Sequence, residues 1–174
     1  EHRGDTMFLS GKIMKGTDHC RAFEANPAAL CVFTGPHAYV SATWYRNTAQ
    51  ASTWNYMSVH VRGTLRFLDA DGLEAVLQKT SLHFEGNETS SPTVFANLTA
   101  EYRNRLLKAI VAFEVEVASI EPVFKLSQNR DRESFRSITD KLSRGDTDAQ
   151  AVAAEMQKRE ESLFVKPQPG QGIS

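Results

Sequence analysis

The first stretch whose residue types suggest chemistry runs from Lys12 to His19, between an expected strand and an expected helix. Its lysines, glycine, threonine and histidine all precede the helix closely. Free N–H groups and the positive end of the helix dipole favour an anion at such a place, and lysine and threonine add charge and hydrogen bonds. Lys15, Thr17 and His19 are therefore candidates for binding a dianionic phosphate, although the GxxxxGK[ST] pattern of a P-loop is absent. A solvated loop with an ordinary helix cap is the alternative interpretation.

Two segments combine aromatic side chains with polar ones, Tyr39–Tyr45 and Thr53–Tyr56, and together they contain both tryptophans of the chain. Flat aromatic walls with nearby amide and hydroxyl groups suit a planar ring system such as a flavin. Aromatic residues in strands also pack in cores and at subunit interfaces, so a structural role is the alternative.

A third polar stretch, Lys125–Arg130, follows an apolar strand and either reaches a ligand or caps the next helix. The histidines form no catalytic arrangement, because His37 and His60 lack a neighbouring nucleophile motif and no HExxH zinc pattern occurs. His60 falls on the polar side of its strand, where it is either exposed or faces a ligand. No pair of carboxylates stands out for acid–base work. These residues indicate anion and ring binding and identify neither a catalytic residue nor a metal site.

Composition narrows the class of protein. The 174 residues include 20 basic and 21 acidic side chains, which gives a formal net charge of −1. A protein that grips nucleic acid by its phosphates normally has a basic surplus or a basic face, so direct DNA binding is the weaker expectation. Cys20 and Cys31 show no CxxC spacing and are interpreted as reduced thiols. With no apolar span and no signal-peptide pattern, we expect a cytoplasmic protein that does not enter a membrane.

Hydrophobic periodicity predicts five strands. Gly35-Pro36 is expected to separate the second of these strands from the third. In the last of them, Glu114 and Glu116 are expected to face the solvent. The expected strands are Thr6–Ser10, Ala29–Phe33, Ala38–Val40, Thr53–Leu68 and Phe113–Val117.

Helices are expected where a capping residue precedes an apolar stripe. The expected caps are Asp18, Asp71, Asp131 and Thr147, for helices that end near Asn26-Pro27, beyond Leu77, near Leu142 and near Leu163, and a further helix is expected over Ala100–Ile110.

Short turns between successive strands favour an antiparallel barrel with helices at its ends. The expected fold class is mostly β with α: a split β-barrel with peripheral helices and a small C-terminal helical appendage. Residues 1–130 form the barrel domain in this interpretation, 131–164 the appendage and 165–174 a flexible tail. The chain opens on a charged turn without a preceding strand, so N-terminal barrel strands are expected to be missing from it.

Several blocks resemble the PaiB-type FMN-binding negative transcriptional regulators, in the order and spacing of that family. The blocks are Lys15–Pro27, Phe33–Ser41 with its GPHAYVS string, Trp44-Tyr45, Thr53–Tyr56 (TWNY), Val59–Gly63 and Phe124–Arg130 (FKLSQNR). The family is similar to the wider pyridoxamine-5'-phosphate oxidase group. That resemblance implies a dimeric split barrel that binds FMN in clefts at the dimer interface.

The resemblance also implies positions for the cofactor contacts. Counting back from Asn26-Pro27 places Thr17 and His19 where the wider group contacts the FMN phosphate, and Lys15 stands where many relatives have arginine. Ser58 and His60 fall on the strand that faces the flavin ring in that group. Contacts with the ring or the partner subunit are implied, less directly, for Trp54, Asn55, Lys125 and Gln128.

Three functions stay open from the sequence. The first is an FMN-binding regulator in a homodimer, with nucleic acid as a partner by family analogy alone. The second is an FMN-dependent oxidoreductase related to the pyridoxamine-5'-phosphate oxidases, since a bound flavin needs from the protein only binding and electrostatics. The third is a flavin-type fold that binds another ligand or none.

Overall fold

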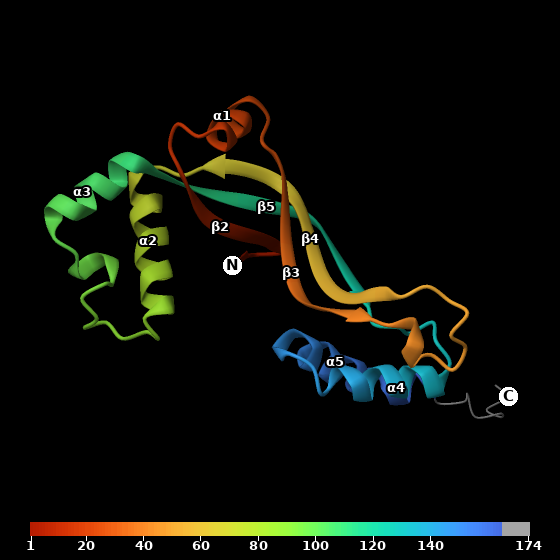
Figure 1. Cartoon of the computed structure of the whole chain (residues 1–174). Coiled ribbons are helices and arrows are strands. Elements are labelled where there is room, and N and C mark those ends of the chain that lie inside the picture. The colour runs from red at the N-terminus through yellow and green to blue at the C-terminus, as the bar shows by residue number, and fades with distance from the viewer. Residues whose placement is uncertain (165–174) are drawn as a thin grey trace, which may run out of the picture. The chain divides into compact units, whose positions relative to one another are not determined.

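Five strands join into one sheet in the order β1-β2-β5-β4-β3 in this computed structural model, which describes residues 1–164 (Figure 1). Strands β1 and β2 pair antiparallel, as do β2 and β5, whose register runs from Phe8 opposite Glu116 to Met14 opposite Ile110. The expected class, an antiparallel sheet with helices, is confirmed. The strands are β1 His2–Arg3, β2 Thr6–Met14, β3 Ala28–Val40, β4 Thr53–Phe67 and β5 Ile110–Lys125. The expected tail at 165–174 lies outside the described residues.

Two strands are longer than the sequence predicts. The expected break at Gly35-Pro36 is wrong, because β3 continues through it as one strand of 13 residues. Proline lacks the N–H that a central strand must donate, but an edge strand tolerates it, and β3 lies at one end of the strand order. Strand β5 has 16 residues because it starts directly where the preceding helix ends and continues past Val117.

The helices are α1 Asp18–Ala25, α2 Ala70–Phe84, α3 Ala100–Ala109, α4 Arg132–Leu142 and α5 Thr147–Phe164, with short 3-10 turns at Ala42–Trp44 and Phe95–Asn97. The cap of α4 is Asp131, as expected. Three other expected caps are one or two residues late, because a capping side chain accepts from an amide two or three residues beyond it. The side chains that accept are Thr17 from the amide of Cys20, Asp69 from that of Gly72 and Asp146 from that of Ala149.

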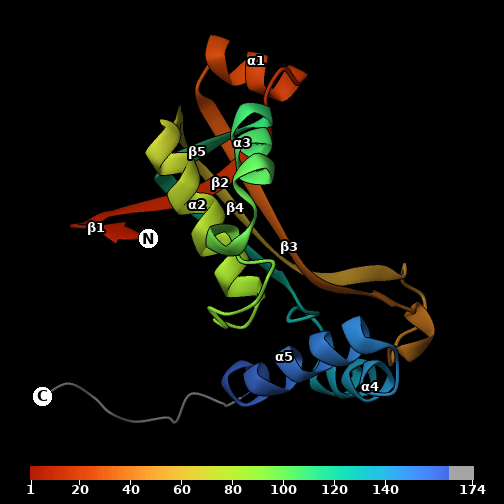
Figure 2. The same cartoon turned by 90° about the vertical axis from the view of Figure 1, so that its left-hand side faces the viewer.

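The chain divides into two compact units, and each has its own core. The first unit comprises Glu1–Cys31 and Val61–Ile120, and in it α2 and α3 lie side by side (Figure 2). Its core contains Leu73, Leu77 and Phe95, and a second cluster forms around Val115.

The second unit comprises Val32–His60 and the described residues from Glu121 onward. Here α4 and α5 pack on each other (Figures 1 and 2). Their apolar faces share one core with β3 and the residues after it. Phe135, Ile138, Val152 and Met156 are fully buried in this core. The contacts thus group the C-terminal helices with strand segments. The domain boundary between residues 130 and 131 stays a prediction.

The expectation that Glu114 faces the solvent is wrong, since its side chain is only 1% exposed. Arg3 donates to both of its carboxylate oxygens, at 3.1 and 2.8 Å, and Arg66 Nε donates at 2.5 Å. Two guanidinium groups thus compensate the buried charge, which an apolar surrounding would otherwise oppose. Glu116 is exposed, as expected. None of the helices within residues 1–164 is long and apolar enough to cross a membrane.

Candidate functional site

The loop between β2 and α1 turns at Gly16, whose φ of +75° lies in the left-handed region that suits glycine. Thr17 follows as the N-cap of α1, and its hydroxyl accepts from the amide of Cys20 at 3.3 Å and donates to the carbonyl of Met14 at 3.0 Å. Because the carbonyl of Thr17 accepts from the amide of Arg21, the backbone N–H groups left over in this first turn of α1 are those of Asp18 and His19.

Side chains around this turn supply further hydrogen-bond donors. Lys15 is held by its backbone N–H, which donates to the carbonyl of Ala109 at 2.8 Å, and its exposed ammonium donates to the carbonyl of Leu107 at 3.2 Å. His19 is exposed and stacks on Phe23 with ring centroids 6.5 Å apart. A Cβ placed on Gly16 would meet no atom within 4 Å, so the loop borders open space.

One negative charge belongs to the same turn. The carboxylate of Asp18 is 97% exposed, and it accepts from Arg21 Nη2 at 2.5 Å. Arg21 Nη1 also donates to the carbonyl of Gly16 at 2.6 Å, which fixes the guanidinium beside the loop. With Asp18 paired to Arg21, the ammonium of Lys15 and the dipole of α1 leave a net positive end that suits an anion.

Asn55 lies in the second unit and has no exposed surface. Its amide oxygen accepts from Ser127 Oγ at 3.0 Å, and its amide nitrogen donates to Met156 Sδ at 3.4 Å. Ser127 has a φ of +58°, which is uncommon for a residue other than glycine, asparagine or aspartate. Asn55 therefore ties the loop after β5 to α5 across the core of the second unit.

The remaining predicted site residues of the second unit are partly or fully exposed. Ser58 and His60 are half-buried on β4. Lys125 Nζ donates to Thr53 Oγ1 at 2.6 Å and lies 6.0 Å from the centroid of the Tyr56 ring. Gln128 closes its own loop, since its amide accepts from the backbone of Leu126 at 2.6 Å and donates to that of Phe124 at 2.7 Å.

Trp54 is half exposed and lines a pocket of about 680 Å³ within the second unit. The pocket is formed by β3, the 3-10 turn after it, β4 and the turn between α4 and α5. Its lining is His37, Ala38, Tyr39, Trp44, Trp54, Lys141, Leu142 and Gly145 to Ala149. The helical side of this pocket has no counterpart among the residues predicted from the sequence. The strand side could have been predicted in part, because His37 and Tyr39 are two residues apart on one strand and therefore share one of its faces.

The nine predicted residues thus fall into two groups. Lys15, Thr17 and His19 come together at one turn of the first unit. The other six, Trp54, Asn55, Ser58, His60, Lys125 and Gln128, belong to the second unit.

The sequence profile of one family, described as "Putative FMN-binding domain", matches residues 1–119, which is more than half of the chain. The chain therefore belongs to this FMN-binding family, as the resemblance to the PaiB-type proteins predicts. FMN is accordingly the cofactor of its family, and the donors at the β2–α1 turn fit a phosphate monoester. The matched range includes all of the predicted contacts except Lys125 and Gln128.

The chain is also similar to two curated proteins and to one solved structure. The chain is 32% identical over 140 residues to "Protease synthase and sporulation protein PAI 2" of Bacillus subtilis, covering 80% of this chain and 67% of that protein. It is 30% identical to the uncharacterized protein AN0679 of Emericella nidulans, over 62% of this chain and 49% of that one. The FAD and heme binding protein of Mycobacterium smegmatis superposes with a TM-score of 0.49 at 21% identity, over 71% and 55% of the two chains. The chain thus spans about half to two thirds of the length of these proteins.

Proposed function

We propose that the chain holds the phosphate of FMN at the β2–α1 turn through Lys15, Thr17 and His19, and that it acts as an FMN-binding regulator. One observation carries the proposal: free backbone amides, a cap hydroxyl and an exposed ammonium meet at the N-terminus of α1. A phosphate carries two negative charges and accepts several hydrogen bonds, so a helix N-terminus with a lysine is a suitable binding place.

Each residue has a distinct part in this proposal. The amides of Asp18 and His19 donate to phosphate oxygens, while Gly16 leaves room for them. The Thr17 hydroxyl exchanges its hydrogen bond to the carbonyl of Met14 for one to a phosphate oxygen. The Lys15 ammonium exchanges its contact with the carbonyl of Leu107 for a charged oxygen. FMN, when bound, supplies electron and hydride transfer chemistry through its ring. Ser58 and His60 are our candidates for contacts with the ring; Trp54, Lys125 and Gln128 are candidates for the ring or a partner subunit, and Asn55 positions the loop after β5.

We further propose that the FMN cleft is completed by a second copy of the chain. Strand β3 leaves large apolar side chains uncovered, among them Val32 and Phe33, each about half exposed. Exposed apolar patches of this kind mark sites of association. An edge strand with such residues suits a symmetric homodimer.

The regulatory part of the proposal rests on kinship, since the name of the Bacillus subtilis relative refers to protease synthesis and sporulation. The near balance of 20 basic and 21 acidic residues favours regulation through a partner over direct contact with DNA. A second candidate is an FMN-dependent oxidoreductase, because the family is described by FMN binding and a bound flavin can transfer electrons.

The phosphate site is tested by comparing FMN with riboflavin, which has the same ring and no phosphate. We expect Lys15→Gln to weaken FMN binding about tenfold or more, because one charge-assisted hydrogen bond is lost, and to leave riboflavin binding unchanged. His19→Gln should act in the same direction. Lys158→Gln, on α5, is the matched control. Equal FMN affinity in all three variants and the wild type would overturn the assignment.

The role of the loaded protein is tested separately. Oxidation of NADH or NADPH by the FMN-bound protein, with turnover, favours the oxidoreductase. Sequence-selective, salt-sensitive binding to DNA, alone or with a partner protein, favours the regulator.

A further inference from the structure

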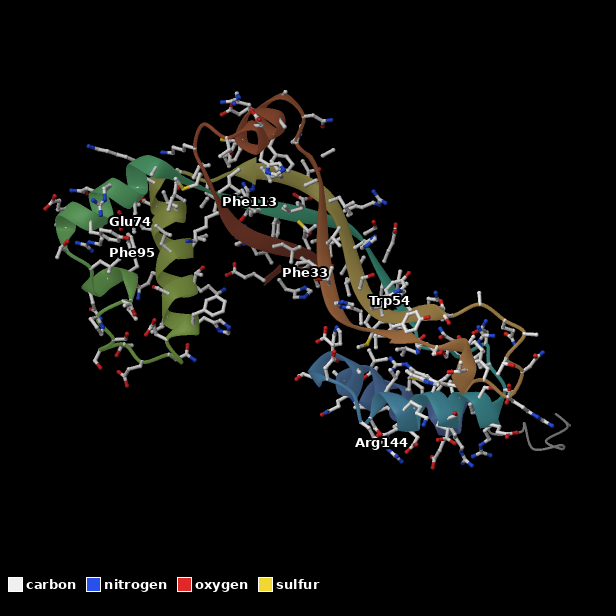
Figure 3. The ribbon with its side chains drawn as sticks, in the orientation of Figure 1. Phe33, Trp54, Glu74, Phe95, Phe113 and Arg144 are labelled. Carbon is white, nitrogen blue, oxygen red and sulfur yellow. The ribbon has the colours of Figure 1, made fainter. Side chains whose placement is uncertain are left out.

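The aromatic pocket of the second unit has chemistry that the proposed phosphate site does not use. Three of its walls are large aromatic rings, those of Tyr39, Trp44 and Trp54, and the fourth is the turn from Gly145 to Ala149. Figure 3 shows Trp54 on β4, next to β3. A volume of about 680 Å³ is in the range of pockets that hold small molecules.

The rings are arranged as a corner. Tyr39 and Trp54 meet at an interplanar angle of 72°, with their centroids 5.8 Å apart. Each of the two side chains is about half exposed, so a large part of their ring surface is uncovered. Two rings at this angle present the edge of one ring and the face of the other to the pocket. The face of an aromatic ring attracts a cation.

A side chain of the chain itself already lies against this corner. The imidazole of His37 lies 5.8 Å from the ring of Trp54, and its Nδ1 is 3.4 Å from a carboxylate oxygen of Asp148. The imidazole thus lies between an aromatic ring and a carboxylate, and the same two groups are suitable neighbours for an organic ammonium group. They are supplied here by β4 and the start of α5.

The charge of the lining favours a cation as well. Asp146 and Asp148 contribute two carboxylates, and Lys141 and the imidazole of His37 are the basic groups that line the pocket. Lys141 is exposed at the end of α4. The next cation along the chain, Arg144, lies on the other side of the helical pair from Trp54, where it pairs with Asp140 at 2.8 Å (Figure 3). An anion would face both carboxylates, whereas an ammonium group would face them and the ring surfaces.

We propose that this pocket binds an organic cation, a substituted ammonium group on a small apolar body, with Tyr39 and Trp54 against the cation and Asp148 as its counter-charge. The ammonium group lies in the aromatic corner and displaces the imidazole of His37 from Asp148. This site is separate from the proposed phosphate site and does not depend on it, and of the candidate contacts with the flavin ring it includes only Trp54.

The test uses two probes of the same shape, choline and its neutral carbon analogue 3,3-dimethylbutan-1-ol. Both tryptophans of the chain line the pocket, so tryptophan fluorescence of the full chain reports occupancy directly. We expect choline to change the fluorescence saturably and to bind about tenfold or more tightly than the neutral analogue, which is the contribution of a partly desolvated cation–π contact.

Variants assign the effect to named side chains, with binding measured by calorimetry and folding by circular dichroism. Tyr39→Leu and Asp148→Asn should each weaken choline binding about fivefold or more, and the matched control Asp140→Asn should not. Tyr39 and Asp148 are both at least half exposed, so these variants are expected to fold. Lys15→Gln should bind choline like the wild type, which separates this site from the phosphate site.

Equal affinity for the two probes would overturn the proposal, as would choline binding that is unchanged in both variants. A third outcome would also overturn it: riboflavin fills the pocket, quenches the tryptophans and is insensitive to Asp148→Asn, while choline leaves the fluorescence unchanged. The occupant would then be a flavin ring.

Discussion

At the scale of single residues, Glu114 illustrates how a charge is kept inside the sheet. The hydrogen bonds from Arg3, together with those from Arg66, hold the pKa of the Glu114 carboxyl below its usual value, although desolvation acts in the opposite direction. Arg3 also lies over the ring of Phe8, 4.5 Å from its centroid. The N-terminal hairpin is thereby fastened to β5 by a side chain of two-residue β1.

We expect Glu114→Gln to lower the free energy of unfolding by about 2 kcal/mol, because charge-assisted hydrogen bonds to a buried group are lost while both arginines stay partly hydrated. Urea unfolding followed by circular dichroism measures this difference. Glu116→Gln, two residues away on the same strand and exposed, should change stability by only a few tenths of a kcal/mol. Similar losses in the two variants would contradict the role assigned to Glu114.

The lowered pKa of Glu114 also predicts a pH dependence. A carboxyl whose pKa is lower in the folded than in the unfolded protein stabilises the fold above its unfolded pKa, and this contribution disappears as the pH falls through the folded pKa. Between neutral pH and the acid range, the wild type should therefore lose more stability than Glu114→Gln. Parallel stability curves for the two proteins would show that Glu114 does not titrate in this way.

Residue types alone indicate the turn at which we propose that phosphate binds, but they do not indicate the partners inside the fold. The polar pattern of β5 is the same for Glu114 and Glu116, and only pairing with Arg3 and Arg66 distinguishes a buried carboxylate from an exposed one. In the same way, Asn55 resembles a ligand-binding residue in sequence, whereas in the fold its amide oxygen accepts from Ser127 and its amide nitrogen donates to Met156. Both distinctions depend on residues more than 45 positions away, which no local pattern contains.

At the scale of elements, β4 and β5 lie close together at Gly63. A Cβ at this position would lie 2.1 Å from the carbonyl oxygen of Glu116 and 2.7 Å from Cγ1 of Val115. Neither the backbone nor the buried Val115 has room to move, so glycine is required here for lack of space.

Gly63→Ala is expected to destabilise the protein by about 2–3 kcal/mol, through overpacking between the two strands. Gly35→Ala is the matched comparison on β3, where the nearest backbone atom would be 3.1 Å from the new methyl group and the effect should be smaller. Thermal unfolding of both variants checks the order. A neutral Gly63→Ala would mean that the strands can separate at this point without cost.

Hydrophobic periodicity predicts most of the helices and strands, but it does not predict the residues at which they begin and end. The long alternation of β4 and the apolar stripes of the helices identify those elements because burial repeats at their periods. Cap positions moved by one or two residues, since several adjacent side chains in each case can accept a hydrogen bond. The continuity of β3 through Gly35-Pro36 depends on its place at the end of the sheet order, which is a property of the whole sheet.

At the scale of the whole molecule, three continuous strands are shared by the two compact units. Each of β3, β4 and β5 contributes residues to both units. Both tryptophans belong to the second unit, whereas Leu77 is buried in the core of the first. Shared strands make separate unfolding of the units costly, because their hydrogen-bond ladders would have to break midway.

We therefore expect Leu77→Ala to lower the unfolding midpoint reported by tryptophan fluorescence as much as that reported by far-ultraviolet circular dichroism. The expected loss is about 2–5 kcal/mol, typical of a buried leucine truncated to alanine. Ile138→Ala, in the core of the second unit, should shift both signals by a similar amount. If Leu77→Ala left the fluorescence midpoint in place, the two units would unfold independently.

One consequence follows from Pro36 in β3. This strand combines an uncovered apolar surface with a free flank, a combination that in many proteins templates uncontrolled growth of sheets into fibrils. Proline opposes that growth, because it carries no amide hydrogen and makes its strand a poorer template for a continuous hydrogen-bond ladder. The apolar side chains of β3 can thus be offered to a chosen neighbour while fibrillar aggregation is discouraged by a single imino acid.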